Sequence, residues 1–424
     1  MKIRYTTLIL GLLILMFLAD GANSILLNLG HDFYRISIFI RLPAEIFFLF
    51  LVSLPGRNNR IWWFVFWIFG VFVIGSLAAM GAYLNYQWLG NFSIINKMLM
   101  LFIAWEAFRQ FFRTEAERRR LFRTYEWLVL IQAAVIILSF LFNWKIFAAY
   151  IDPSSGEIVK FGFQGLIPAQ NEISGFFVIA FFFFLWQAAY FRRGWLQLII
   201  IMTAGLFTGT KVCLALPVIL AGYLAARWCA SLIKGRISIS FLILAGIAAL
   251  LAVLAWIERD VIWERLAPTI AYYTYKTVGQ LNNWNLIDVV STGRTFKVKL
   301  FLDTYLPRFN VVNYLFGGHD LASFSVETDL FDVLARFGII GGGVFFIFYI
   351  SLLLKHANRL GWVQVTFIGL WLGVSMTAGH LIFSAINGCY LAILILLFTS
   401  PIITQSHILG GTVMQAQVAP MGMK

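Results

Sequence analysis

The chain has 424 residues, of which 61% are hydrophobic and only 12% are charged. Soluble domains carry charge on about a quarter of their residues, so this chain has too little polar surface to cover itself in water. Lipid must surround most of it, which excludes a soluble globular protein. The net charge of +13 does not indicate a nucleic-acid partner, because Lys and Arg lie in short clusters between apolar segments, where they mark cytoplasmic loops.

Twelve transmembrane helices are predicted, because a helix needs about 20 mostly apolar residues to cross a bilayer. The first follows a basic start and lacks a clear small-residue cleavage site, so we interpret it as a retained signal anchor. The predicted spans are residues 6–26, 36–54, 61–84, 93–112, 125–147, 169–190, 195–209, 211–228, 237–257, 339–354, 363–384 and 387–404.

The basic clusters test this count. With twelve spans and a cytoplasmic N-terminus, all of them fall on the cytoplasmic side. Segment 195–228 is predicted as two short helices that meet at residues 209–211, because one long helix would bury Lys211 at mid-bilayer and reverse the sidedness of everything downstream. Lys211 then lies at an outer apex, where it can meet an anionic lipid head group or simply extend toward water.

The predicted fold class is an all-α polytopic membrane protein with one large, partly helical extracytoplasmic loop. Residues 1–257 carry the first nine helices, 258–338 form the loop, 339–404 carry the last three helices, and 405–424 form a cytoplasmic tail. Both termini are then cytoplasmic. A loop of this length with its own secondary structure is usually functional.

Ionisable residues inside the predicted spans are few. Arg41 and Glu45 lie four residues apart on one helix face and can pair with each other, and Glu106 and Arg109 are expected to form a structural pair. We interpret His380 as a packed, hydrogen-bonded histidine. The three cysteines show no paired spacing and are interpreted as packing residues; they are Cys213, Cys229 and Cys389.

The outer loop carries the candidate chemistry. Arg294 follows a glycine at the start of a predicted helix over residues 295–305, and a guanidinium can hold a phosphate through two hydrogen bonds. Arg308 lies at the far end of that helix. Nearly balanced acidic and basic residues suit a site that binds an anionic leaving group and also moves a proton.

The remaining candidates lie toward the end of the loop. Glu327 and Asp329 precede a helix that returns to the membrane, Arg336 lies close by, and His319 follows a Gly-Gly turn. The loop has no phosphate-binding glycine loop, nucleophile elbow or zinc-ligand spacing. The sequence therefore predicts no metal and no cofactor.

Four segments, in their order along the chain, resemble the O-antigen ligase and O-antigen polymerase superfamily of bacterial membrane glycosyltransferases. They are GFQGLIPAQNEISGFF (162–177), the Gly-Thr-Lys apex (209–211), Gly-Arg (293–294) and LFGG…ETDLFDVLARFGIIGG (315–342). In that superfamily the first segment has a Gly and then an Asn leading into a helix, which Asn171 matches. The second usually has Ser-Arg, where this chain has Thr210-Lys211 and retains the positive charge. Ligases usually carry a histidine where this chain has Glu327, so the resemblance is closer to the polymerase branch.

The resemblance implies a polymerase of a bacterial surface polysaccharide in the cytoplasmic (inner) membrane. Such an enzyme transfers a glycan from polyprenyl pyrophosphate onto a lipid-linked repeat unit, on the periplasmic side, without a nucleotide. Its partners would be lipid-linked oligosaccharide, membrane lipid, a chain-length regulator and a flippase, and no nucleic acid. The phenylalanines of residues 161–184 would line a groove for the polyprenyl chain, or simply pack.

The resemblance also implies roles for the candidate residues. Cations should face the departing pyrophosphate, and a carboxylate or imidazole should take the proton of the acceptor hydroxyl. The residues in these roles are Arg294, Lys211 and Arg308 for the pyrophosphate, Glu327 as the leading proton acceptor with Asp329 and His319 behind it, and Asn171 and Arg336 in support.

Two other functions are compatible with the sequence. A ligase of the same superfamily would join finished glycan to lipid A-core. A transporter, such as a flippase for lipid-linked sugars, also suits twelve helices. Transporters usually show two similar halves with polar residues at mid-membrane, whereas the polar residues of this chain are concentrated in one outer loop.

Overall fold

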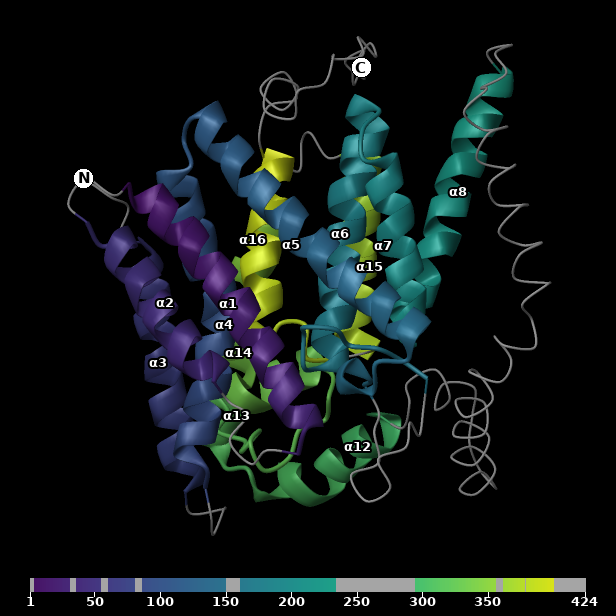
Figure 1. Ribbon diagram of the computed structural model, residues 1–424. Helices are drawn as coiled ribbons and strands as arrows, with labels where there is room; N and C mark the ends of the chain where they lie inside the picture. Colours follow the sequence, from purple (N-terminus) through teal and green to yellow (C-terminus); the bar gives the residue numbers. More distant parts are fainter. Residues whose placement is uncertain are drawn as a thin grey trace, which may run out of the picture.

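The protein is an α-helical membrane protein. The computed structural model describes residues 4–30, 36–54, 60–80, 86–149, 161–233, 294–355, 361–377 and 379–399, and these contain helices but no strand (Figure 1). Six described helices are long and apolar enough to cross a membrane. They are α1 (Tyr5–Asn28), α3 (Arg60–Ala79), α4 (Trp88–Phe111), α5 (Glu115–Phe142), α6 (Gln170–Phe191) and α14 (Asp329–Leu353).

Five further helices lie in predicted spans. They are α2 (Ser37–Val52), α7 (Trp195–Phe207), α8 (Lys211–Ile233), α15 (Trp362–Thr377) and α16 (Ala385–Thr399). The chain breaks between α7 and α8 at residues 208–210, which confirms two helices there. The predicted span at residues 237–257 lies outside the described residues, and the number twelve is not confirmed.

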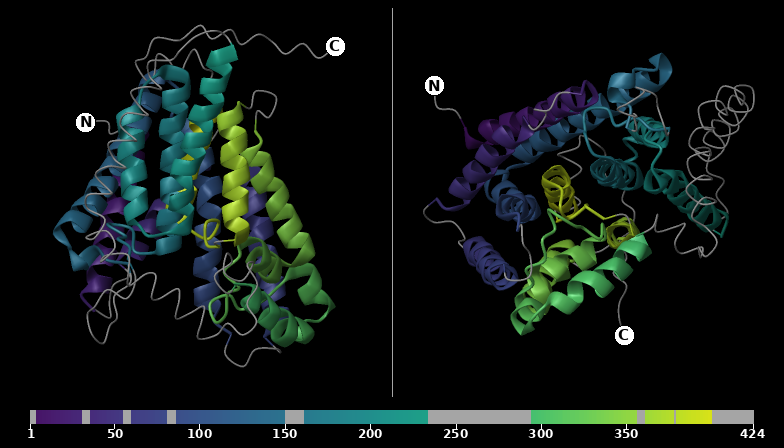
Figure 2. Two further views of the ribbon diagram at one scale, coloured as in Figure 1. Left: turned by 90° about the vertical axis from the view of Figure 1, so that its right-hand side faces the viewer. Right: turned by 90° about the horizontal axis from the view of Figure 1, so that it is seen from below.

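Helices α6 and α16 form the centre of the bundle. In the view from below, α16 (yellow) is surrounded by other helices (Figure 2), and it packs closely against both α4 and α6. Beyond the first turn of α6, both helices are predominantly apolar around their circumference, as expected of an enclosed helix. The six phenylalanines between residues 176 and 184 have no exposed surface, so they pack the core and do not line a lipid groove.

The returning helix begins earlier than predicted. We predicted a loop to residue 338 and a helix from 339, but α14 starts at Asp329 and bends at Gly338, where the backbone has φ 64° and ψ −171°. The pattern of apolar residues marked only the half beyond the bend. The helix predicted over residues 295–305 is confirmed as α12 (Arg294–Leu300) followed by a wider π turn (Phe301–Tyr305). A 3-10 turn (Leu306–Arg308) and α13 (Val311–Phe316) follow, and residues 317–328 lead without a further helix to α14.

Close backbone contacts at three glycines join α14 to α3 and to the turn after α13. We call these three residues, Gly75, Gly317 and Gly338, the glycine crossing. A Cβ atom added to Gly75 would lie 2.4 Å from the carbonyl oxygen of Phe316, and one added to Gly338 would lie 2.4 Å from the carbonyl carbon of Leu315. A Cβ on Gly317 would lie 2.2 Å from the Arg336 backbone. These contacts are between backbones, so only glycine fits. The glycines of the 315–342 segment therefore serve helix packing.

Two predicted ion pairs have different outcomes. Glu106 and Arg109 do pair, with an oxygen–nitrogen distance of 2.5 Å. The spacing of Arg41 and Glu45 allows the two residues to pair, but they do not; the Arg41 guanidinium instead donates to the Asp20 carboxylate on α1. The prediction was wrong because an i,i+4 pattern detects only partners on the same helix.

The crossing predicts a contrast between two glycines of α14. We expect Gly338→Ala to lower the free energy of unfolding by roughly 2–4 kcal/mol, because the new Cβ is both strained and obstructed. Gly343→Ala is the control, since a Cβ there meets nothing within 4 Å. Thermal unfolding of both variants in detergent, followed by size-exclusion chromatography, measures the difference. Equal stability of the two variants would contradict the crossing.

Candidate functional site

A cavity of about 380 Å³ is bounded in part by the start of α12. Several chain segments that are far apart in sequence meet there: α4, the first turn of α6, the start of α12, the residue before the α14 N-cap, and the connection between α15 and α16. The lining residues are Lys97, Ala169, Gln170, Asn171, Glu172, Arg294, Glu327, His380 and Phe383.

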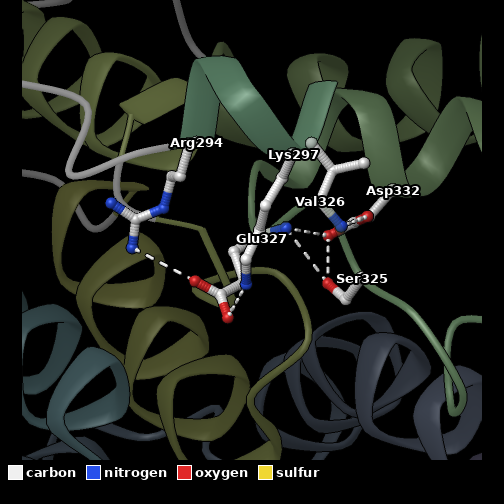
Figure 3. Close-up of polar contacts among 6 residues, drawn as sticks. All are labelled: Arg294, Lys297, Ser325, Val326, Glu327 and Asp332. Atoms are coloured by element: carbon white, nitrogen blue, oxygen red, sulfur yellow. Dashed lines mark hydrogen bonds and ion pairs between the residues drawn. The ribbon is translucent and has the colours of Figure 1, made fainter. Parts of the chain in front are cut away.

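Three of the predicted site residues are brought together in this cavity: Asn171, Arg294 and Glu327. The Glu327 carboxylate lies between two cations of α12. Its Oε1 accepts a hydrogen bond from the Lys297 ammonium at 2.5 Å, and its Oε2 lies 4.0 Å from an Arg294 guanidinium nitrogen (Figure 3). The structure thus joins the two ends of the loop that the sequence pointed to.

The backbone at the cavity is strained at two positions. Four described residues other than glycine have positive φ. Asn143 and Arg192 are the C-caps of α5 and α6, where this conformation is common. The other two are Glu327 and His380, both at φ 64°, and both line the cavity. Such positions cost about 1–3 kcal/mol each and cluster at functional sites.

Asp332 in the first turn of α14 holds the backbone ahead of that helix. Its Oδ1 accepts the Val326 N–H at 2.9 Å, and its Oδ2 accepts the Glu327 N–H at 3.1 Å. The same Oδ2 accepts the Ser325 hydroxyl at 2.7 Å (Figure 3). A carboxylate is favoured at this position because the helix N-terminus carries partial positive charge. Asp332 therefore fixes the direction in which the Glu327 side chain points from the backbone.

Asp329 holds the connection between α15 and α16, which contains His380, in a similar way. It does not line the cavity; it is fully buried, and its Oδ2 accepts the N–H groups of Leu381 and Ile382, each at 3.1 Å. The two loops also touch directly, because a Cβ added to Gly379 would lie 1.9 Å from the Glu327 carbonyl oxygen. Carboxylates one turn apart on α14 thus position both Glu327 and His380.

His319 lies outside the cavity. Its ring is enclosed by aromatic side chains, with centroids 4.9 Å from Phe301 and 5.0 Å from Tyr305, and its Nε2 lies 2.9 Å from the Phe324 carbonyl oxygen. Burial lowers the pKa of His319 to about 4, so the ring is neutral near pH 7. The structure gives it a packing environment.

The other three candidates also lie outside the cavity lining. Arg308 is exposed, with its guanidinium carbon 5.8 Å from the Tyr305 ring centroid. Lys211 is exposed at the first residue of α8. Arg336 is fully buried and donates to the His319 carbonyl oxygen at 3.0 Å and to the Ser76 hydroxyl at 2.9 Å. It connects α14 to α3 and to the turn behind the site.

Three cavity residues were missed or misinterpreted from sequence. Lys97 and Glu172 were not singled out, although an ionisable side chain in an apolar helix is itself a signal. His380 was interpreted as a packed, hydrogen-bonded histidine, but it lines the cavity, and its ring forms no hydrogen bond within the described part of the chain. Among described residues, no cluster of three His, Cys, Asp or Glu is placed to hold a metal ion.

Comparison of the sequence with models of known protein families gives no match, and comparison with curated proteins gives none either.

The environment of His319 predicts a pH effect on stability. The folded-state pKa, about 4, lies below the value of about 6.5 expected for an unfolded chain, so the unfolded state binds the proton more tightly. The stability this residue contributes is complete above pH 6.5 and is lost as the pH falls toward 4, by about 2 kcal/mol at pH 5.

A variant isolates this contribution. The difference in Tm between the wild type and His319→Gln should shrink as the pH is lowered from 7.5 to 5, because only the wild type has this group to protonate. Thermal unfolding in detergent at several pH values measures it. A Tm difference that stays constant across this range would show that His319 is not held neutral.

Proposed function

We propose that this chain is a polymerase of a bacterial surface polysaccharide, transferring a polyprenyl-pyrophosphate-linked glycan onto a lipid-linked repeat unit. The observation that carries the proposal is a cavity that brings cations and proton acceptors together. Glu327 and His380, the two described non-glycine residues that have positive φ without capping a helix C-terminus, both line it. The resemblance of four segments to the polymerase branch supports the substrate class. Residues of three of those segments, Asn171, Arg294 and Glu327, line this one cavity.

The positive charges of the cavity suit the leaving group. When the glycosidic bond breaks, the departing pyrophosphate gains charge, and fixed cations that face it stabilise the transition state. Arg294 and Lys97 line the cavity from α12 and α4. The first turn of α6, residues 170–172, adds backbone N–H groups at a helix N-terminus, a favourable place for phosphate oxygens.

The same cavity holds groups that can accept a proton. The acceptor hydroxyl must lose its proton as it attacks, and Glu327 and His380 are both within the lining. Glu327 occupies the position where ligases of the superfamily usually carry histidine. This difference favours the polymerase over the ligase.

The arrangement of the helices supports an outward-facing cavity. Helix α6 begins in the cavity lining and has 22 residues, which span about 33 Å, enough to cross the hydrocarbon core. Arg192 and Arg193 follow at its other end. Because basic residues mark the cytoplasmic side, the cavity would face the periplasm, where lipid-linked sugars are polymerised, and the protein would reside in the cytoplasmic membrane.

Two arginines of the loop provide the test. We expect Arg294→Ala to reduce polymer synthesis by about 10²–10³-fold, the usual cost of removing one transition-state charge contact. Arg308→Ala is the matched control and should retain activity, because Arg308 is exposed outside the cavity. The assay uses purified protein with lipid-linked repeat units and resolves the product ladder on a gel.

The outcomes separate the alternatives. Equal ladders from Arg294→Ala and Arg308→Ala would contradict the site. Absence of polymer from the wild type, with polymer accumulating on the lipid carrier in a deletion strain, would instead indicate a ligase. Synthesis without any membrane barrier would exclude a transporter.

The backbone contact between Gly379 and Glu327 gives a second test. Gly379→Ala should abolish polymer synthesis, since its Cβ would displace the Glu327 backbone. Gly373→Ala on α15 is the control, because a Cβ there has open space around it. If Gly379→Ala retains wild-type synthesis at comparable protein levels, the precise backbone geometry of Glu327 is not required.

A further inference from the structure

Both oxygens of the Glu327 carboxylate face cations. Oε1 already accepts the Lys297 ammonium at 2.5 Å, and Oε2 faces Arg294 at 4.0 Å. An acceptor hydroxyl that approached either oxygen would have to compete with one of these cations. The carboxylate can hold the two cations in place without any change in its own charge.

His380 has the opposite surroundings. Its ring lines the cavity and forms no hydrogen bond within the described residues, so a ring nitrogen can accept one from a bound hydroxyl. Its position is well determined, because Asp329 holds the next two backbone N–H groups and Gly379 packs on the Glu327 carbonyl. Strain at a non-glycine residue persists only where the surroundings impose it.

Burial lowers the pKa of the His380 imidazole, which favours the neutral ring that a proton acceptor requires, and the neighbouring carboxylates oppose this effect. The carboxylates of Asp332, Glu327 and Glu172 act on the ring, and the opposing cation is Arg294; Lys97 lines the same cavity. Nearby carboxylates stabilise an imidazolium as it forms, as in the triad of serine hydrolases.

We propose that the His380 imidazole accepts the proton of the acceptor hydroxyl, while Glu327 orders Arg294 and Lys297. This rests on the proposed function. The hydroxyl oxygen bonds to the anomeric carbon of the donor glycan as its O–H proton passes to a neutral ring nitrogen of His380. The bond from that carbon to the pyrophosphate oxygen breaks, its electron pair leaves with the pyrophosphate, and the imidazolium then returns its proton to water.

The first test compares variants in the purified polymerisation assay. His380→Ala and His380→Gln should each lower turnover by about 10²–10⁴-fold, the usual contribution of a general base. Added imidazole should restore part of the activity of His380→Ala, because it can occupy the vacated space and accept the proton. It should not restore Glu327→Gln, in which an ion-pair partner is lost and no base is missing.

The second test needs no variant. The turnover of the wild type should fall on the acid side as the His380 ring becomes protonated, and this acid limb should be absent from the residual activity of His380→Gln. A wild-type acid limb that persists unchanged in His380→Gln would overturn the proposal. Imidazole restoring Glu327→Gln as well as His380→Ala would also overturn it, as would near-normal turnover of His380→Gln. A wild type without polymerase activity would instead contradict the proposed function.

Discussion

The candidate site depends on two carboxylates in the first turn of α14. Asp332 holds the Ser325–Glu327 backbone and Asp329 holds the backbone at Leu381 and Ile382. Each accepts N–H groups from a loop, and each lies where the helix dipole stabilises negative charge. Both loops contain a residue in the left-handed region, and hydrogen bonds to buried carboxylates can offset that cost. Without these bonds, neither Glu327 nor His380 would have a defined direction.

The sequence predicted the membrane class and much of the helix pattern because both follow from hydropathy and the bilayer thickness. It also pointed to Arg294 and Glu327, which are charged residues beside glycine and helix-start signals. It did not predict that Asp329, two residues after Glu327, turns away from the cavity. The reason is the left-handed backbone at Glu327, which changes the course of the chain within two residues and leaves no mark in the pattern of residue types.

His380 and Lys97 show a different limit of the sequence. They lie in predicted spans, far from the outer loop, and their proximity to Arg294 and Glu327 depends on how α4, α14 and the α15–α16 connection pack. The pairing of Arg41 with Asp20 has the same origin. Periodicity identifies neighbours on one helix, whereas the identity of a partner on another helix is set by the tertiary arrangement. For that reason Arg308 and His319, which lie in the same loop as Arg294, were predicted as site residues although the fold places them elsewhere.

The glycine crossing between α3 and α14 affects how the protein can respond to its lipid. Backbones in direct contact at Gly75, Gly317 and Gly338 leave no side chains that could slide or repack. When a bilayer is thinner or thicker than the hydrophobic length of a helix, the helix tilts. These two helices must then tilt together as one body, carrying the first turn of α14 with them. A change in acyl-chain length would therefore move Asp329 and Asp332, which position Glu327 and His380, together with α3.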